Sequence, residues 1–334
     1  AAQLDGAFAL LDGDDRAQHP EVRAVALATL AKAGPVHGGE RALRAACART
    51  HDRDVSVRKA AAEAIPALVA APDDKLAIST LIAQCQGDRD HRAREAAITA
   101  LPKVVRPGHE PSFAAVLPNT DSLDHGVRRA AAAALPLMVD GPPMVVQAIE
   151  TLLRMIEDAY EEVRLAVVHS LGKLAKPSDS EVVGRLIACL EDIDPTVRQA
   201  NIDLLVRLAG RGDERVLAAL YETLERPDPK RRQGAVEALW QLAVHGDPEA
   251  IERTAICLEA RDQHVRRAAV EASARLAPQG DSYAIARIAL RLEHGDHWVR
   301  RAAVEALGRI VARGDRTAQS AAIARLEHAE DDAR

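Results

Sequence analysis

Aromatic side chains are scarce in this sequence: two Trp, three Tyr and two Phe make up 2% of its 334 residues. So few rings disfavour a β-sandwich and an aromatic platform on which nucleic-acid bases stack. The formal net charge is only -6, which argues against a protein that seeks nucleic acid through a generally basic surface. No apolar run approaches the 18 residues of a membrane-spanning helix, and the first residues lack a signal-peptide pattern.

Cysteine is equally sparse, with four residues and no C-x-x-C pair, so no zinc site is indicated. No helix carries an H-x-x-x-H pair, and no nucleophile elbow, phosphate loop or serine–histidine arrangement occurs. We therefore predict no catalytic residue, no cofactor and no metal. The cysteines are interpreted as small buried residues in a reducing, intracellular compartment, the cytoplasm.

A repeated phrase takes the place of such motifs. "DHGVRRAAAAALPLMV" at 124, "DQHVRRAAVEASARLA" at 262 and "DHWVRRAAVEALGRIV" at 296 are three of its copies. The first arginine of the phrase recurs every 34 to 36 residues, at Arg23, Arg58, Arg94, Arg128, Arg164, Arg198, Arg232, Arg266 and Arg300. A period this steady is typical of a solenoid, in which each unit packs mainly on its neighbours.

Each of these arginines opens a helix, which we name helix B. Four residues before it stands an aspartate suited to cap a helix N-terminus, at Asp54, Asp90, Asp124, Asp194, Asp228, Asp262 and Asp296. Apolar residues follow at offsets -1, +3, +6, +7, +10 and +11 from the arginine, a period of 3.6 with one buried face. Fifteen residues after it, a second aspartate caps helix A of the next repeat, and a glycine in four copies precedes it to make the turn: Asp179, Asp213, Asp247, Asp281 and Asp315, after Gly212, Gly246, Gly280 and Gly314.

These residues resemble the two-helix HEAT repeats, especially the short variety named after phycobilisome lyases, with its D-x-x-V-R-x-x-A-x-x-A-L phrase. The resemblance covers the whole chain and implies an all-α fold, a right-handed α-solenoid of about nine repeats over residues 1–334. Solenoids need polar caps at their ends. Both ends of the sequence look open, so we expect a segment of a longer array; a partner that covers the ends is the alternative.

The resemblance also implies that the helix-opening arginines form a structural ladder with turn aspartates and carbonyl groups of the next repeat. A ladder that binds phosphates is the alternative, reinforced by the second arginines. We predict that these second arginines are solvated and that ion pairs four residues apart join Lys59 to Glu63, Arg267 to Glu271 and Arg301 to Glu305. Histidines that share offset -3, His91, His125 and His297, are predicted to be solvated turn residues.

The exposed stripe of helix B falls at offsets +1, +5, +8 and +12, and the family places it on the concave side. Prolines at +8 in three early repeats, Pro66, Pro102 and Pro136, predict local curvature. Trp240 has the same offset and is typical of an apolar anchor in a polar rim, although packing between B helices is the alternative. Its predicted companions are Val206, Val244, His169, Gln199, Asp203, Gln233 and Glu237.

Trp298 stands where other repeats have small or polar residues, and is predicted either to contact a partner or to cover its own turn. With Arg267 and Arg301 it completes the predicted contact set. We expect a non-enzymatic scaffold that binds a protein through the B-helix face, with nucleic acid disfavoured. The alternatives implied by the resemblance are a bilin-lyase subunit and a DNA-glycosylase-like protein, for which Trp240 with Asp203 is the nearest constellation. Deoxyhypusine hydroxylase is disfavoured, because His109–Glu110 is the sole His-Glu dyad.

Overall fold

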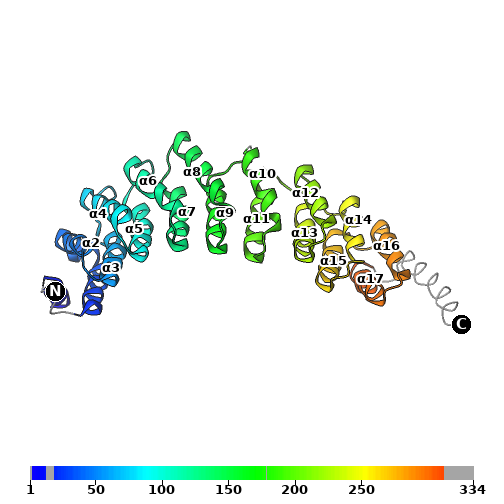
Figure 1. Ribbon diagram of the computed structural model, residues 1–334, viewed down its shortest axis with the longest axis horizontal. Coiled ribbons are helices and arrows are strands. Elements are labelled where there is room, and N and C mark those ends of the chain that lie inside the picture. The colour runs from blue at the N-terminus through cyan, green and yellow to red at the C-terminus, as the bar shows by residue number, and fades with distance from the viewer. Residues whose placement is uncertain (1, 13–18, 178, 312–334) are drawn as a thin grey trace. The chain divides into compact units, whose positions relative to one another are not determined.

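The computed structural model describes residues 2–12, 19–177 and 179–311, and all regular structure in those residues is helical. The chain divides into two compact units, Ala1–Ala175 and Lys176–Arg334. Within each unit the A helices form one layer and the B helices a second, as Figure 1 shows. The all-α solenoid architecture predicted from the period is therefore confirmed.

The first unit contains α1 to α9: α1 (Ala2–Asp12), α2 (Pro20–Arg49), α3 (Val55–Leu68), α4 (Lys75–Gly87), α5 (His91–Val104), α6 (Glu110–Val116), η1 (Leu117–Asp121), α7 (His125–Met138), α8 (Pro142–Met155) and α9 (Glu161–Leu174). The second contains α10 (Ser180–Ala188), η2 (Cys189–Glu191), α11 (Pro195–Leu208), α12 (Glu214–Glu225), α13 (Pro229–Leu242), α14 (Pro248–Cys257), α15 (Gln263–Leu276), α16 (Ser282–Ala289), η3 (Leu290–Glu293) and α17 (His297–Ile310). The odd-numbered helices from α3 onward are B helices. The long α2 bends at Gly34 and Gly39 and holds the first B helix and the next A helix.

Aspartate caps begin these helices where the sequence predicts them. The seven aspartates before the B helices each accept a backbone N–H of the first turn, and so do Asp213, Asp247 and Asp281 before A helices. Each cap satisfies N–H groups that a helix start leaves without a partner, which stabilises it by about 1 kcal/mol. Asp179 differs, because its carboxylate accepts the Lys176 N–H at 2.7 Å. Gly314 and Asp315 lie outside the described residues.

Residues with positive φ connect each repeat to the next. Gly212, Gly246 and Gly280 have φ values of 82°, 84° and 78°. In this conformation, which glycine adopts without strain, each N–H donates to the carbonyl of the last residue of the following B helix, at 2.7 to 2.8 Å. Asp73, the one non-glycine residue with positive φ in the described part, makes the same bond to Val104 at 2.8 Å.

The core lies between the two layers of each unit. In α7 the predicted apolar positions Val127, Ala131, Leu135 and Met138 are at most 1% exposed. Burying a leucine-sized side chain contributes about 1.5–3 kcal/mol, and alanine at the other positions lets helices approach closely. This face therefore fixes which side of each B helix remains available to solvent.

Candidate functional site

The helix-opening arginines of the first unit form charged rungs between successive repeats. Arg58 Nε and Nη2 donate to the two carboxylate oxygens of Asp88 at 2.8 and 2.9 Å. Arg128 holds Asp158 in the same bidentate way at 2.7 and 2.8 Å, and Arg23 binds Asp52. Each aspartate lies two residues before the N-cap residue of the next B helix. Its carboxylate also accepts the N–H of that N-cap residue. The ladder reading is thus confirmed for these three rungs.

These rungs shift the acid–base properties of their members. Burial alone would raise the pKa of Asp88, but the hydrogen bonds from Arg58 and from the Asp90 N–H outweigh it, so the pKa is lowered. The same balance lowers the pKa of Asp52 and of Asp158. The hydrogen bond to Asp88 in turn raises the pKa of Arg58. The rungs therefore favour charged carboxylates in the folded chain.

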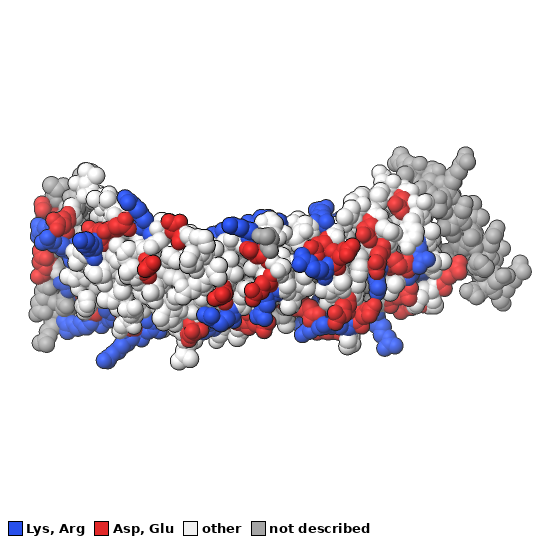
Figure 2. Space-filling model, turned by 90° about the horizontal axis from the view of Figure 1, so that it is seen from above, with Lys and Arg blue, Asp and Glu red and all other residues white. Residues whose placement is uncertain are grey.

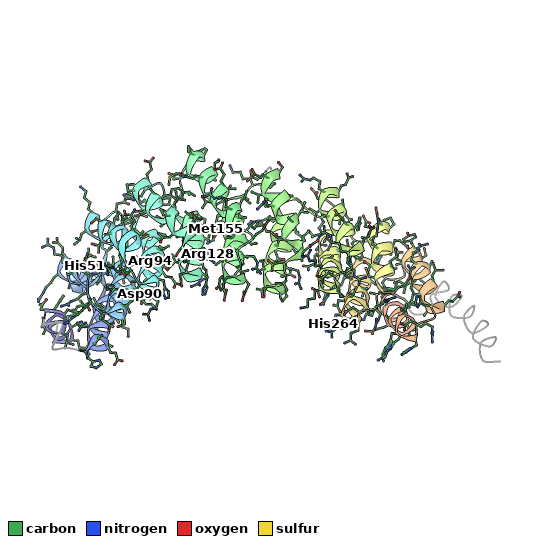
Figure 3. The ribbon with its side chains drawn as sticks, in the orientation of Figure 1. His51, Asp90, Arg94, Arg128, Met155 and His264 are labelled. Carbon is green, nitrogen blue, oxygen red and sulfur yellow. The ribbon has the colours of Figure 1, made fainter. Side chains whose placement is uncertain are left out.

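The carbonyl groups that the ladder arginines bind belong to their own repeat, whereas the prediction placed them in the next repeat. Arg58 Nη1 donates to the carbonyls of Asp52 and Arg53, which belong to its own repeat and not to the next one. The reason is that an arginine in the first turn of a helix lies over the turn that leads into it. Arg94 lies on α5 next to α7 with Arg128 (Figure 3). Among the described residues it makes only these carbonyl bonds, because Ser122 stands where the three rungs have a carboxylate.

Two adjoining hollows occupy the B-helix side of the first unit. One of about 470 Å³ lies over α3, α5 and α7, and one of about 650 Å³ lies over α5, α7 and α9. They share Glu95, Arg129 and Ala133. Their lining residues include the +1 and +5 positions of these helices, so the predicted exposed stripe is where the surface is hollowed. We call the two hollows together the first-unit groove.

Small side chains form the bottom of the first-unit groove, and longer ones its walls. Leu137 is 49% exposed and contributes apolar surface, while Lys103 and Lys173 add positive charge. Arg129 pairs with Glu95 across two helices at 2.5 Å. The groove thus combines accessible apolar area with paired and unpaired charge, as binding pockets do. Its alanines are Ala96, Ala100, Ala130, Ala133, Ala134 and Ala166.

The prolines at offset +8 also belong to this surface. Pro66, Pro102 and Pro136 each lie two residues before the end of their helix, where each lacks the N–H that would bond to the carbonyl four residues earlier. Pro66 and Pro102 line the first hollow. These two prolines therefore form part of the groove surface, in addition to the role in curvature that the sequence predicted.

The histidines at offset -3 are exposed turn residues, as predicted, and two of them also contact the next repeat. His91 Nδ1 lies 3.2 Å from Asp124 Oδ2, and the rings of His125 and Tyr160 stack with centroids 4.4 Å apart. In both cases the histidine of one B helix meets the N-cap residue of the next B helix. The sequence did not show these neighbours, because it presents each turn alone, without the repeat stacked beside it.

In the second unit, Trp240 is half-buried and covered by a cation. The guanidinium carbon of Arg275 lies 4.2 Å from the indole centroid, and Arg275 is itself held by Glu271. Trp240 shares α13 with Gln233, which donates to Glu237 at 2.7 Å. The structure thus places the tryptophan under an arginine on the B-helix surface of α13 and α15.

The predicted companions of Trp240 are only partly brought together. Gln199 of α11 donates to Asp203 at 2.8 Å and to Gln241 of α13 at 2.9 Å, which joins it to the same surface. Val206 is half-buried and Val244, 51% exposed, leans over Gly212. His169 belongs to the first unit, where it lines the larger hollow.

Trp298 is exposed on its turn, as predicted, whereas the acids expected to pair with the second arginines have other partners. Trp298 is 48% exposed, with His297 and Arg301 against its ring. Of the three predicted ion pairs, Lys59–Glu63 forms at 3.7 Å. Glu271 instead pairs with Arg275 and Arg309, and Glu305 with Arg309, because the arginines at offset +9 reach these carboxylates. Arg267 is exposed on α15.

The remaining surface offers less chemistry. Over α6 and α8 the A-helix side of the first unit carries few charged side chains (Figure 2). In the part of the chain that the structure describes, no group of three His, Cys, Asp or Glu side chains could hold a metal ion. No described helix combines the length and hydropathy needed to cross a membrane. Burial raises the pKa of Cys85 to about 12 and that of Cys257 to about 11.

Sequence reasoning missed the first-unit groove as a candidate site. Its signal was nevertheless present at offset +5, where Thr99 and Ala133 are short while the flanking repeats have Glu63 and His169. Two short side chains on adjacent helices leave a depression between longer ones. Attention to the single tryptophan of the stripe drew the prediction to α13 instead.

Comparison with known proteins agrees with this architecture. The family model described as HEAT repeats matches residues 111–205, 149–240, 184–274 and 251–334. No curated protein sequence matches the chain. Among solved structures, yeast importin-β, Kap95p, from a complex with RanGDP has a TM-score of 0.70 at 14% identity and covers 92% of this chain. An importin-β structure and Kap121p bound to Nup53p have TM-scores of 0.65 and 0.60 at 16% and 15% identity, over 93% and 92% of this chain.

The chain spans 44%, 48% and 36% of the length of these three structures, that is, less than half of each. At such low identity the likeness concerns the fold and not the activity.

Proposed function

Because the chain belongs to the HEAT-repeat family, we propose that it is a non-enzymatic scaffold that binds a segment of a partner protein in the first-unit groove. The observation that carries this proposal is the pair of adjoining hollows, about 470 and 650 Å³, on four successive B helices. A HEAT-like array exposes such a stripe on every repeat, and here it is hollowed where the side chains are short. The alternatives of a bilin-lyase subunit and a glycosylase have no comparable feature in their favour.

The dimensions of the groove suit an extended segment. Neighbouring helices pack roughly 8–10 Å apart, so four of them span roughly 30 Å. An extended chain advances about 3.3 Å per residue, so about nine residues cross that distance. Leu137 and the alanine floor would receive apolar side chains of the segment. Lys103 and Lys173, which form no ion pair in the described residues, would meet its acceptors.

The Trp240 surface is the second candidate for the same function. Arg275 covers the indole face and Glu271 fixes that arginine, so a partner would have to displace an existing contact. The contact set predicted from the sequence, including Trp298, Arg267 and Arg301, remains a hypothesis. So does the prediction that residues 1–334 form one array.

The structural neighbours support a protein partner. Two of them are proteins with a protein partner: Kap95p with RanGDP, and Kap121p with Nup53p. These partners belong to those proteins. For this chain they support only the choice of a protein as the class of ligand.

The test is a matched pair of alanine-to-arginine variants. Ala133 is exposed at the centre of the groove, and Ala114 is exposed on α6 in the opposite layer of the same unit. A partner is first identified by affinity purification of the full chain and then purified. We expect Ala133→Arg to weaken its binding at least tenfold in calorimetry, because a long charged side chain fills the hollow. Ala114→Arg should bind as wild type. Equal binding by Ala133→Arg and wild type, or loss only in Ala114→Arg, refutes the assignment.

A further inference from the structure

The residue type two positions before the N-cap of each B helix changes along the chain. In the first unit it holds Asp52, Asp88 and Asp158, the acceptors of the arginine rungs, with Ser122 as the exception. The first B helix of the second unit still has an aspartate there, Asp192, which accepts the Asp194 N–H. In the last three repeats described, Arg226, Ala260 and His294 hold this position instead. The backbone there is the same capped turn, so the fold is kept while the carboxylates are gone.

The arginines of these repeats are left with unused donors. Arg266 Nη1 makes the usual bonds to the carbonyls of Ala260 and Arg261, both at 2.7 Å. Its Nε and Nη2, which bind a carboxylate in Arg58, have no acceptor in the described residues. Arg232 Nε is buried without any hydrogen-bond partner. An unpaired buried donor of this kind costs free energy.

Arg198 has found other partners within the chain in place of the missing carboxylate. The position that would hold its aspartate is occupied by Arg226, which has the same charge. Arg198 instead lies against Gly234, where a Cβ would come within 2.9 Å of its Cδ and Nε, and it approaches Glu237 at 3.5 Å. Arg226 is held by Glu191 and Glu222. No such rearrangement accompanies Arg232 and Arg266.

The surroundings of these two arginines are positive and have few spare acids. Arg261, His264 (Figure 3) and Arg267 are exposed beside them. The Asp262 carboxylate accepts two N–H groups as the cap of α15, and Glu259 pairs with Arg291. We call Arg232, Arg261, Arg266 and Arg267 the arginine edge.

We propose that the arginine edge binds an acidic segment of a partner protein, whose carboxylates take the places left by Ala260 and His294. Successive rungs are about 10 Å apart, which corresponds to about three residues of an extended chain. The segment therefore carries acidic residues at every third position. The bidentate geometry of the Asp88 and Asp158 rungs is the template for each contact. This site shares no residue with the first-unit groove and does not depend on the proposal made for it.

A nucleic acid fits the edge less well. Its phosphates follow one another continuously and need a broad basic surface, whereas Asp262 and Glu259 lie among the arginines here. A peptide can present single carboxylates to the two arginines and neutral residues between them, at turns where the Ala260 side chain has no acceptor and, among the described residues, His294 Nδ1 accepts only the Asp296 N–H. The net charge of -6 of the whole chain also disfavours a nucleic acid.

The test rebuilds the ladder from within. The double variant Ala260→Asp/His294→Asp restores the residue type that the first unit has, and the control Ala218→Asp adds the same charge type at an exposed position of α12. The probe is a fluorescent peptide with aspartate at every third position, compared with a peptide of the same composition in scrambled order. Fluorescence anisotropy on the full chain measures binding, and thermal unfolding measures stability.

We expect the wild type to prefer the regular peptide, and the double variant to bind it about tenfold more weakly or worse while its melting temperature rises, since its own aspartates now occupy the arginines. Ala218→Asp should bind as wild type, and added salt should weaken binding steeply. Three results overturn the proposal. They are no preference for the regular peptide, equal loss in Ala218→Asp, and tighter binding of a thymidine oligonucleotide that the peptide fails to displace.

Discussion

Removing one carboxylate of the ladder provides the sharpest test of how the repeats are held together. In Asp88→Ala, Arg58 loses two hydrogen bonds of 2.8 and 2.9 Å, and the Asp90 N–H loses its acceptor at 3.0 Å. The Asp88 side chain is 5% exposed and that of Arg58 is 16% exposed. Breaking a buried pair costs about 3–5 kcal/mol. Because Arg58 can regain some water at the turn, we expect a loss at the lower end, about 3 kcal/mol.

Urea unfolding followed by circular dichroism measures this loss, and hydrogen exchange locates it. The matched control is Asp121→Ala, which removes an equal charge at an exposed position of the same unit and should change stability by at most about 0.5 kcal/mol. Faster exchange in Asp88→Ala should be concentrated in α3 and α5, the helices that the rung joins. If Asp88→Ala is no less stable than Asp121→Ala, the ladder contributes nothing and the reasoning fails.

Two further predictions follow from the shifted pKa values. The pKa values of Asp52, Asp88 and Asp158 are lower in the folded chain than the ordinary value near 3.8. Their stabilisation is therefore complete above about pH 4 and is lost as the pH falls through the folded-state values. Urea midpoints should drop steeply below about pH 4 in wild type and less steeply in Asp88→Ala; parallel profiles would count against the shift. Burial raises the pKa of Cys85 to about 12 and of Cys257 to about 11, so a thiol reagent at about pH 8 should label the partly exposed Cys189 first. Mass spectrometry that finds Cys85 labelled as fast as Cys189 in the native chain would contradict this.

Most of the fold could be predicted because its signals are local. A cap such as Asp262 acts on N–H groups two and three residues away, and the turn glycine Gly246 needs its positive φ whatever surrounds it. The contacts between repeats were harder to predict. The carboxylate for Arg58 lies 30 residues on, while its carbonyl acceptors lie in its own turn, and only the stacked geometry distinguishes the two.

The candidate site depended on side-chain size over several helices. Ala133 marks no motif by itself, and it becomes the centre of the groove only because Thr99 on α5 is also short. Trp240 attracted the prediction because tryptophan is rare in this sequence, yet the sequence could not show that Arg275 would cover its ring. The absent carboxylates at Ala260 and His294 were readable from the sequence, but their meaning required the Arg–Asp rungs of the first unit as a reference.

Hydrogen exchange of the full chain with and without its purified partner tests the central claim most directly. We predict that the partner slows exchange in α5, α7 and α9, the B helices that line the larger hollow of the first-unit groove, and that Ala133→Arg abolishes this protection. Protection confined to the A helices α4, α6 and α8 would contradict the account.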